Sequence, residues 1–260
     1  MSRIAPFETP PRVKPATDDV AHALARGELC LAYQPIYRLS TGRMMKVEAL
    51  LRWKRRGVLI PPDEFIPRME ELGVIESVGR WVAESACAQA TAWNEGGTPV
   101  RVSFNVSPRQ LEAGDFPAAV REALARTRCK PEWLEVEITE QCVMRDFEAM
   151  RRALCELAEL GVSIAIDDFG TGYSSLARLA HLPAQSIKLD RALVAGAHDE
   201  FRRAAIVDSI VTLCGTLGLD VTAEGVEHAE DAAYLSRFER ICVQGFLFSR
   251  PVPPDRVLPG

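Results

Sequence analysis

The sequence predicts an α/β protein whose strands close into a barrel. Strand and helix patterns alternate along most of the chain, which requires crossover connections and a mainly parallel sheet. The length of 260 residues fits a single barrel of about 250 residues. A carboxylate, an amide or a lysine also stands near the C-terminal end of strand after strand. In a parallel barrel the loops at that end meet at one rim and build the active site.

The predicted elements follow a tail. Prolines at positions 6, 10, 11 and 15 interrupt any regular pattern, so residues 1–16 are expected to form a flexible segment. Thr17 is expected to be the N-cap of a short helix that Gly27 closes. The predicted strands span residues 29–33, 44–53, 100–106, 134–139, 162–167, 186–190, 219–224 and 241–248.

The connections decide the topology. Only about ten residues (34–43) join the first two strands, which is too short for a helical crossover, so this pair is expected to be antiparallel. Helices separate most of the other strands. The two clearest carry an apolar stripe at helical spacing: Ile75, Val78, Val82 and Ala86 in 75–93, and Ile206, Ile210, Leu213 and Leu217 in 201–217.

The phase of the strands predicts which side chains face the barrel interior. Side chains alternate between two faces, and in 162–167 the aliphatic residues share one face while Ser163, Ala165 and Asp167 share the other. The aliphatic face is expected to pack on the outer helices. The same division in the other strands directs a polar set inward: Glu48, Asn105, Glu137, Asp167, Lys188, Glu224 and Gln244. Asp168 is the exception, because alternation places it on the outer face, opposite Asp167.

The polar set predicts metal-assisted chemistry. Five carboxylates at one rim would repel one another, which implies one bound cation or two. Asp167 and Asp168 at a strand end can hold a metal pair, although an acidic turn before a capped helix is the alternative. Lys188 is either a counter-ion or a catalytic group. Beside bound cations its pKa should be lowered, which suits a base or a donor that orients water.

Three further charged residues extend this hypothesis. Arg52 shares a strand face with Glu48 and could bind a phosphate, or the two could form a buried ion pair. Glu140 could fix the loop from residue 168 to 175 through backbone N–H groups, or be a solvated acid. Glu227 is expected to cap the following helix.

Composition excludes several classes of function. A net charge of -5 provides no basic field for nucleic acid polymers or anionic membranes. No apolar run reaches the roughly 18 residues of a membrane span. The seven cysteines include no Cys-x-x-Cys pair, which argues against zinc and favours a reducing, cytoplasmic location. A P-loop and a Gly-x-Ser-x-Gly elbow are both missing.

The order of the motifs is similar to that of one bacterial signalling family. The motifs are Gln-Pro-Ile (34–36), Glu-Ala-Leu-Leu-Arg-Trp (48–53), Phe-Asn-Val-Ser (104–107), Glu-Ile-Thr-Glu (137–140), Asp-Asp-Phe-Gly-Thr-Gly-Tyr-Ser-Ser-Leu (167–176), Ile-Lys-Leu-Asp (187–190), Ala-Glu-Gly-Val-Glu (223–227) and Gln-Gly-Phe (244–246). Together they resemble the EAL-domain cyclic-di-GMP phosphodiesterases. The likeness runs from about residue 18 to 254, so residues 17–260 are assigned to one such domain. At 239–242, Glu-Arg-Ile-Cys departs from the family's more usual Gly-Cys-Asp.

The resemblance implies a fold and a role for each residue. The fold is a TIM-like (β/α)8 barrel with an antiparallel first strand. Two Mg²⁺ or Mn²⁺ ions are implied, with Asp167 bridging them, on ligands that match Glu48, Asn105, Glu137, Asp167, Asp168 and Glu224. Lys188 resembles the catalytic lysine that contacts the attacking water. Glu140 resembles the glutamate that holds the loop after Asp168. Substrate contacts are implied for Gln34, Arg52 and Gln244.

The implied reaction is hydrolysis of cyclic di-GMP to linear 5'-pGpG. The alternative is a non-catalytic receptor or docking module, although the matching residues are all present. Without the resemblance, a barrel with Mg²⁺ and a lysine base could also abstract a proton beside a carboxylate, as enolase-type enzymes do. The adjacency of Asp167 and Asp168 favours a two-metal phosphate site instead.

The resemblance also implies a homodimer. We expect light scattering at working concentration to give twice the mass of one chain. A monomeric mass under the same conditions would contradict this expectation.

Overall fold

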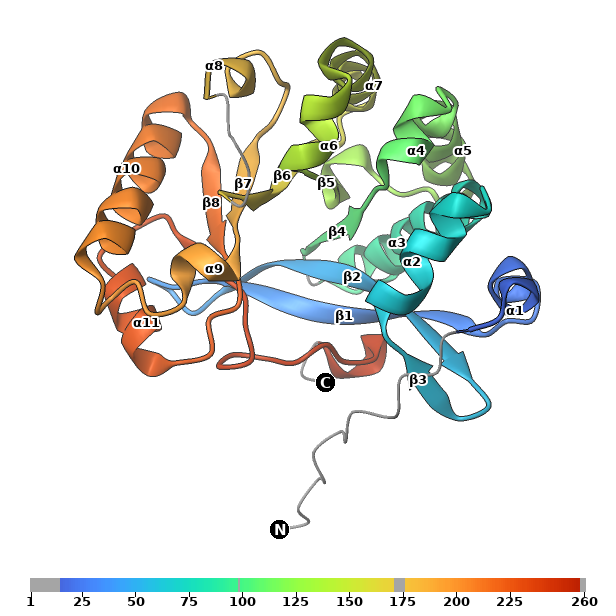
Figure 1. The fold of residues 1–260 in the computed structure, drawn as a ribbon, viewed down its shortest axis with the longest axis horizontal. Helices are drawn as coiled ribbons and strands as arrows, with labels where there is room; N and C mark the ends of the chain where they lie inside the picture. Colours follow the sequence, from blue (N-terminus) through green and yellow to red (C-terminus); the bar gives the residue numbers. More distant parts are fainter. Residues whose placement is uncertain (1–14, 98, 171–175, 258–260) are drawn as a thin grey trace.

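The strands of this protein close into a mixed barrel with helices around it (Figure 1). The structure, a computed structural model, describes residues 15–97, 99–170 and 176–257. Within these ranges eight strands follow the order β1-β9-β8-β7-β6-β5-β4-β2, and the pairing of β1 with β2 closes the circle. The predicted α/β, TIM-like barrel is therefore confirmed.

The barrel strands are short except for the first two. They are β1 (Leu29–Arg38), β2 (Met44–Arg55), β4 (Arg101–Asn105), β5 (Leu134–Thr139), β6 (Ser163–Phe169), β7 (Ser186–Leu189), β8 (Asp220–Ala223) and β9 (Cys242–Val243). A further strand, β3 (Val58–Ile60), extends the end of β2 as a hairpin.

Helices fill most connections. They are α1 (Thr17–His22), α2 (Pro62–Glu71), α3 (Ile75–Glu95), α4 (Pro108–Glu112), α5 (Phe116–Thr127), α6 (Glu140–Arg145), α7 (Phe147–Glu159), α8 (Leu176–Leu179), α9 (Arg191–Val194), α10 (Phe201–Leu217) and α11 (Ala229–Leu235), with 3-10 turns at Pro131–Trp133 and Pro254–Arg256. Among the described residues, no helix is both long and apolar enough to cross a membrane.

The antiparallel first strand is confirmed. β1 runs antiparallel to both of its neighbours, β2 and β9. The strand is longer than predicted, because residues 34–38 continue it and leave a turn at 39–43. Gln34 therefore lies opposite Glu48 within the sheet. This register brings an amide and a carboxylate from the two strands together at the rim.

The last predicted strand is mostly wrong. Residues 241–248 were expected to be extended, but only Cys242 and Val243 pair with neighbours. The chain leaves the sheet at Gly245. This residue packs so tightly on the neighbouring loop after β8 that a Cβ there would lie 2.0 Å from the carbonyl oxygen of Val226. Gln244 thus stands just beyond the strand, at the rim.

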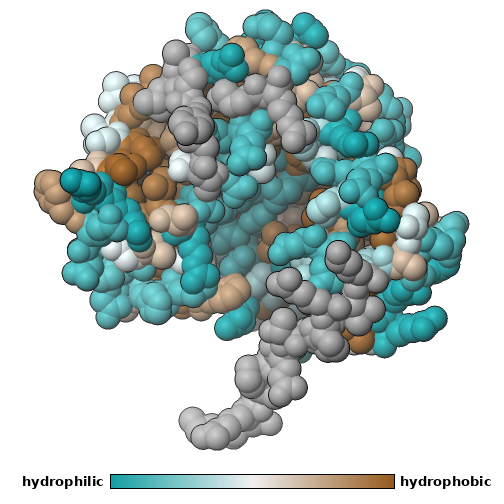
Figure 2. Space-filling model, in the orientation of Figure 1, coloured by the Kyte–Doolittle hydropathy of each residue, from teal (hydrophilic) through white to brown (hydrophobic). Residues whose placement is uncertain are grey.

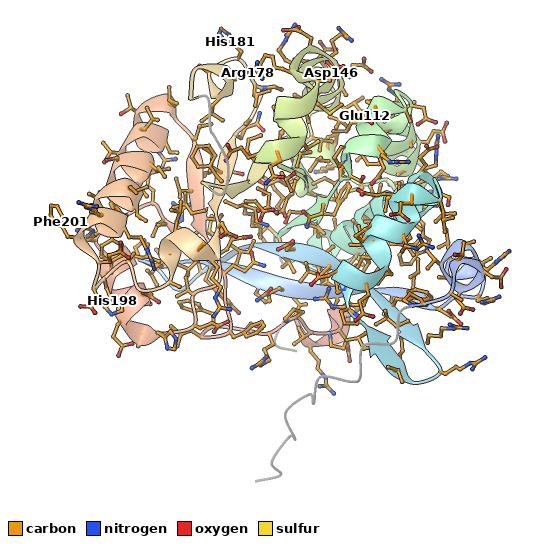
Figure 3. All side chains as sticks on the ribbon, in the orientation of Figure 1. Glu112, Asp146, Arg178, His181, His198 and Phe201 are labelled. Atoms are coloured by element: carbon orange, nitrogen blue, oxygen red, sulfur yellow. The ribbon has the colours of Figure 1, made fainter. Side chains whose placement is uncertain are left out.

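The two long helices differ in how well their buried faces were predicted. All four residues of the predicted stripe of α3 are buried. In α10 the predicted stripe is wrong at its two ends, because Ile206 and Leu217 are exposed, whereas Ile210 is half-buried against the core and Val207 and Cys214 are buried. The apolar residues of α10 cover a face wider than the part that is buried, so periodicity could not define which of them meet the core. Phe201, at its start, extends from the molecule and is 87% exposed (Figure 3).

The helix before β1, α1, begins at Thr17 itself, whereas an N-cap at Thr17 would require it to begin at Asp18. Its N-cap is Ala16, which provides no side-chain hydrogen bond, so the predicted cap is wrong. The hydroxyl oxygen of Thr17 instead accepts a hydrogen bond from Arg68 of α2 at 2.9 Å. The predicted flexible tail at 1–16 falls almost entirely outside the described residues.

The inward faces carry polar side chains, as the strand phase predicted. At the N-terminal end of the barrel, Lys46 of β2 forms a buried ion pair with Glu135 of β5. Ser186 of β7 donates a hydrogen bond to the same carboxylate at 3.3 Å, and Arg101 lies 3.6 Å from it. Burial would raise the pKa of Glu135, but Lys46 and Arg101 hold it below its usual value.

We expect Lys46→Ala to lower the free energy of unfolding by about 3 kcal/mol, because it leaves the buried Glu135 carboxylate without its main partner. Chemical denaturation would measure this loss. A carboxyl group with a depressed pKa stabilises the fold above its ordinary pKa, so the loss should shrink as the pH falls below 4.5. The control is Arg151→Ala, which removes an exposed ion pair with Glu148. Equal effects of the two substitutions would contradict the prediction.

Candidate active site

A buried lysine stands at the centre of the predicted site. The Nζ atom of Lys188, at the end of β7, is surrounded by carboxylates from β2, β5, β6 and the segment after β8. The distances are 2.6 Å to Glu137, 2.6 Å to Glu224, 3.3 Å to Glu48 and 3.4 Å to Asp167. Lys188 is only 1% exposed. The strand phase therefore predicted this cluster correctly.

The charges of the cluster do not balance. Burial alone would lower the pKa of Lys188, but the surrounding carboxylates outweigh it and raise that pKa well above its usual value. The sequence led us to expect a lowered pKa for Lys188 beside bound cations. With the protein's own charges alone, the shift has the opposite direction. Four carboxylates face one ammonium group, so the centre carries excess negative charge.

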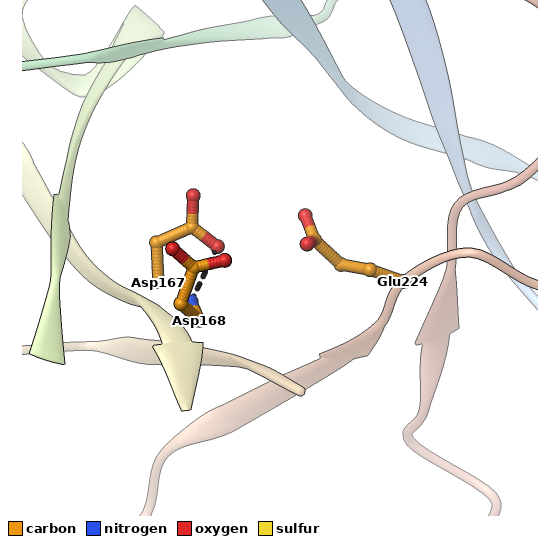
Figure 4. Close-up of side chains that lie close together, drawn as sticks. All are labelled: Asp167, Asp168 and Glu224. Carbon is orange, nitrogen blue, oxygen red and sulfur yellow. Dashed lines mark hydrogen bonds between the residues drawn. The ribbon is translucent and has the colours of Figure 1, made fainter. Parts of the chain in front are cut away.

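A kink in β6 brings the two adjacent aspartates to the same point. The pairing of β6 with β7 shifts register between Ile166 and Phe169, and Asp168 has a left-handed backbone with φ of 54°. Asp168, which the regular alternation placed on the outer face, consequently turns toward the site. Carboxylate oxygens of Asp167, Asp168 and Glu224 lie within 4.8 Å of one another (Figure 4).

Burial and mutual repulsion raise the pKa values of three carboxylates at this site. Burial and the neighbouring Asp167 raise the pKa of Asp168. Burial also raises the pKa of Glu224 to about 8, although Lys188 opposes the shift. The pKa of Glu137 rises well above its usual value through burial and the nearby Glu48, again against Lys188. Each shift reflects burial together with the negative charge of neighbouring carboxylates.

The donor set fits divalent cations. The Oε1 atom of Glu137 is buried and has no hydrogen-bond partner among the described residues. A buried carboxylate oxygen without a partner is costly, and a cation would satisfy it. Carboxylate and amide oxygens are the ligands that Mg²⁺ and similar hard cations prefer.

Two amides hold Glu48 from either side. Asn105, at the end of β4, donates from Nδ2 to Oε1 of Glu48 at 2.7 Å, and Gln244 donates from Nε2 to Oε2 at 2.7 Å. Gln244 also donates to Oε1 of Gln34 at 3.1 Å. Burial would raise the pKa of Glu48, but Lys188 and the two amides lower it. Asn105, Gln244 and Lys188, all predicted site residues, thus converge on the carboxylate of Glu48.

Arg52 lies apart from this pocket. Lys188 and Glu48 line a cavity of about 310 Å³, whereas Arg52 lines a neighbouring one of about 420 Å³ together with Asn105. Its Nη1 atom donates to the carbonyl of Leu51 at 2.9 Å, and no ion pair joins it to Glu48 in the described part of the chain.

The face of the molecule in Figure 2 is hollowed near its centre, and the floor of the hollow is hydrophilic.

Glu140 holds the start of the loop after β6. It is the first residue of α6 and only 2% exposed, which excludes the alternative of a solvated acid. Its Oε2 atom accepts a hydrogen bond from the backbone N–H of Gly170 at 3.1 Å. Residues 171–175, which form most of this loop, lie outside the described residues.

The structure adds residues that the sequence reasoning missed. Arg191, Phe246 and Leu50 line the same cavity as Lys188. The expected capping role of Glu227 is wrong, because His228 is the N-cap of α11 and Glu227 instead pairs with Arg191. The position of Arg191, three residues beyond Lys188 and just past the end of β7, was the available signal.

Comparison with known proteins gives the family. The family model described as the EAL domain matches residues 17–251. The chain belongs to the EAL domain family. MucR of Pseudomonas aeruginosa, named a bifunctional diguanylate cyclase/cyclic di-GMP phosphodiesterase, is 41% identical over 242 residues, which are 92% of this chain and 35% of MucR. The cyclic di-GMP phosphodiesterase PdeR of Escherichia coli is 38% identical over 233 residues, with 89% and 35% covered. This EAL domain thus spans 35% of the length of each relative.

Solved structures of other EAL proteins share the fold. The PaMucR phosphodiesterase in complex with c-di-GMP superposes with a TM-score of 0.88 at 41% identity, covering 93% of this chain and 98% of that one. The EAL enzyme Bd1971, bound to cAMP and cyclic di-GMP, gives a TM-score of 0.86 at 30% identity, with 92% and 66% covered.

We expect Glu140→Ala to reduce the phosphodiester hydrolysis that is proposed below about 100-fold, because the loop after Asp168 loses its anchor at Gly170 and small misplacements at a site are costly. The free energy of unfolding should fall by only about 1 kcal/mol. Turnover, hydrogen exchange at Gly170 and denaturation would measure the three effects. The control is Glu148→Ala, an exposed acid on α7. Unchanged turnover at saturating Mg²⁺ would exclude this role for Glu140.

Proposed function

We propose that this EAL domain is a metal-dependent phosphodiesterase that hydrolyses cyclic di-GMP to linear 5'-pGpG. The observation that carries the proposal is the buried Lys188 among four carboxylates, with an oxygen of Glu137 that has no hydrogen-bond partner among the described residues. The names of MucR and PdeR and the bound ligand of PaMucR support the substrate. A cytoplasmic homodimer, acting in bacterial second-messenger signalling, is part of the same proposal.

The acidic rim suits this substrate only when cations are bound. A cyclic dinucleotide carries two negative charges, which the carboxylates would repel. The residues proposed to hold two Mg²⁺ or Mn²⁺ ions are Glu48, Asn105, Glu137, Asp167, Asp168 and Glu224. Such ions lower the pKa of water and neutralise the charge that develops on a phosphate.

The chain's own residues orient the reactants. Lys188 has three N–H donors, and its carboxylate neighbours fix the direction of its amine, so it can position the attacking water and stabilise negative charge there. The amides of Asn105 and Gln244 keep the Glu48 carboxylate in place. Gln34 and Gln244 on one side and Arg52 on the other are proposed to contact the dinucleotide.

The deciding experiment is to incubate the purified protein with cyclic di-GMP and Mg²⁺ or Mn²⁺ and to separate the nucleotides by chromatography. We expect pGpG to appear with either metal and to be absent with EDTA. Glu48→Gln should reduce the rate at least about 1,000-fold, since it removes a proposed metal ligand. The exposed Glu71→Gln serves as the matched control. Binding of cyclic di-GMP without any product would favour the receptor alternative over the enzyme.

A further inference from the structure

An arginine on the wall of the pocket has no role in the function proposed above. Arg191 is the first residue of α9, directly after Asp190, the N-cap of that helix. It lines the cavity of about 310 Å³ that also contains Lys188 and Glu224. Lys188 is buried, whereas the side chain of Arg191 is 58% exposed. A guanidinium group is therefore open to a ligand at the edge of the pocket.

The guanidinium group is held as a fork. Its two terminal nitrogens bind the two oxygens of Glu227, at 2.8 and 2.9 Å. The stem of Arg191 passes over Gly225, where a Cβ would lie 2.5 Å from the Cβ of Arg191. Glycine at this position, with φ of 63°, therefore permits the path of the side chain. The result is a pair of parallel donors whose direction is already set.

Glu227 presents two adjacent acceptors, and a ligand that replaces it must do the same. Exposed ion pairs contribute little stability, so Arg191 can exchange this partner at small cost. The O6 and N7 atoms of guanine form such an acceptor pair, which arginine binds bidentately. Adenine offers an amino group where guanine has O6, and arginine has no acceptor for it.

An exposed aromatic ring lines the same cavity. Phe246 is 47% exposed, and the guanidinium of Arg250 packs 4.2 Å from the centre of its ring. Aromatic side chains that remain open to solvent provide stacking surfaces for nucleobases. The pocket thus combines a surface for a planar ring with a fork for two acceptors on the edge of that ring.

We propose that Arg191 is a specificity-determining residue that reads the O6 and N7 edge of one guanine while the base stacks on Phe246. Glu227 occupies the fork when no nucleotide is bound, and guanine replaces it. The inference rests on the proposed function for the choice of a guanine dinucleotide as ligand. It adds the residue that distinguishes guanine from adenine.

The test compares kcat/KM for cyclic di-GMP and cyclic di-AMP in the wild type, Arg191→Ala and Arg191→Lys. We expect the preference for cyclic di-GMP to fall about ten- to hundred-fold in both variants, mainly through KM, because lysine keeps the charge but loses the fork. The melting temperature should stay within about 2 °C of the wild type. Arg151→Ala and Arg151→Lys, at an exposed arginine paired with Glu148, should keep the full preference.

Three results would overturn the inference. Equal losses of kcat/KM for both dinucleotides would mean that Arg191 contacts a phosphate rather than the base. A full preference in Arg191→Lys would mean that only the positive charge matters. An unchanged preference in both variants would mean that Arg191 does not recognise the base. If the wild type binds cyclic di-GMP without cleaving it, the proposed function fails and the ratio of dissociation constants replaces kcat/KM. Loss of the preference in that ratio would still support the inference. A wild type that binds neither dinucleotide would overturn both.

Discussion

The ammonium group of Lys188 is the contact that four carboxylates at the rim of this barrel share. Carboxylates from β2, β5, β6 and the segment after β8 approach it to between 2.6 and 3.4 Å. In surroundings of low dielectric constant these carboxylates would repel one another strongly if the lysine were missing. Because they arrive from different sides of the barrel, the same contacts also join strands that are not neighbours. The arrangement of these carboxylates at the site therefore depends on one side chain.

The two ends of the barrel interior use buried charge differently. At the N-terminal end, Lys46 and Ser186 both contact Glu135, and no side-chain atom of these three is left buried without a partner. At the rim, buried oxygens of Glu137 and Gln244 have no partner in the described part of the chain. A closed network of ion pairs stabilises the fold, whereas an open one provides ligands. This contrast supports a ligand at the rim.

Strand periodicity predicted the inward residues because it depends only on local geometry. That is why Lys188 and its partners were identified before any contact was known. Asp168 could not be placed in this way, since a register shift between β6 and β7 turns it inward. The buried face of α10 was missed because its apolar residues cover a face wider than the buried one, so tertiary packing decides that Val207 rather than Ile206 meets the core. The separation of Arg52 from the lysine pocket likewise depends on how α2 and α3 pack against the rim.

The seam between β1 and β9 joins the two ends of the sequence. The hydrogen bond from Gln244 to Gln34 crosses it and links residues 210 positions apart. Chain closure over such a separation is entropically expensive and slow relative to local pairing. During synthesis, β2 can pair with β1 early, but the amide pair at the rim forms only after residue 244 has emerged. The carboxylate of Glu48 therefore lacks its second amide until residue 244 is present, and a chain that ends before this residue lacks the complete site.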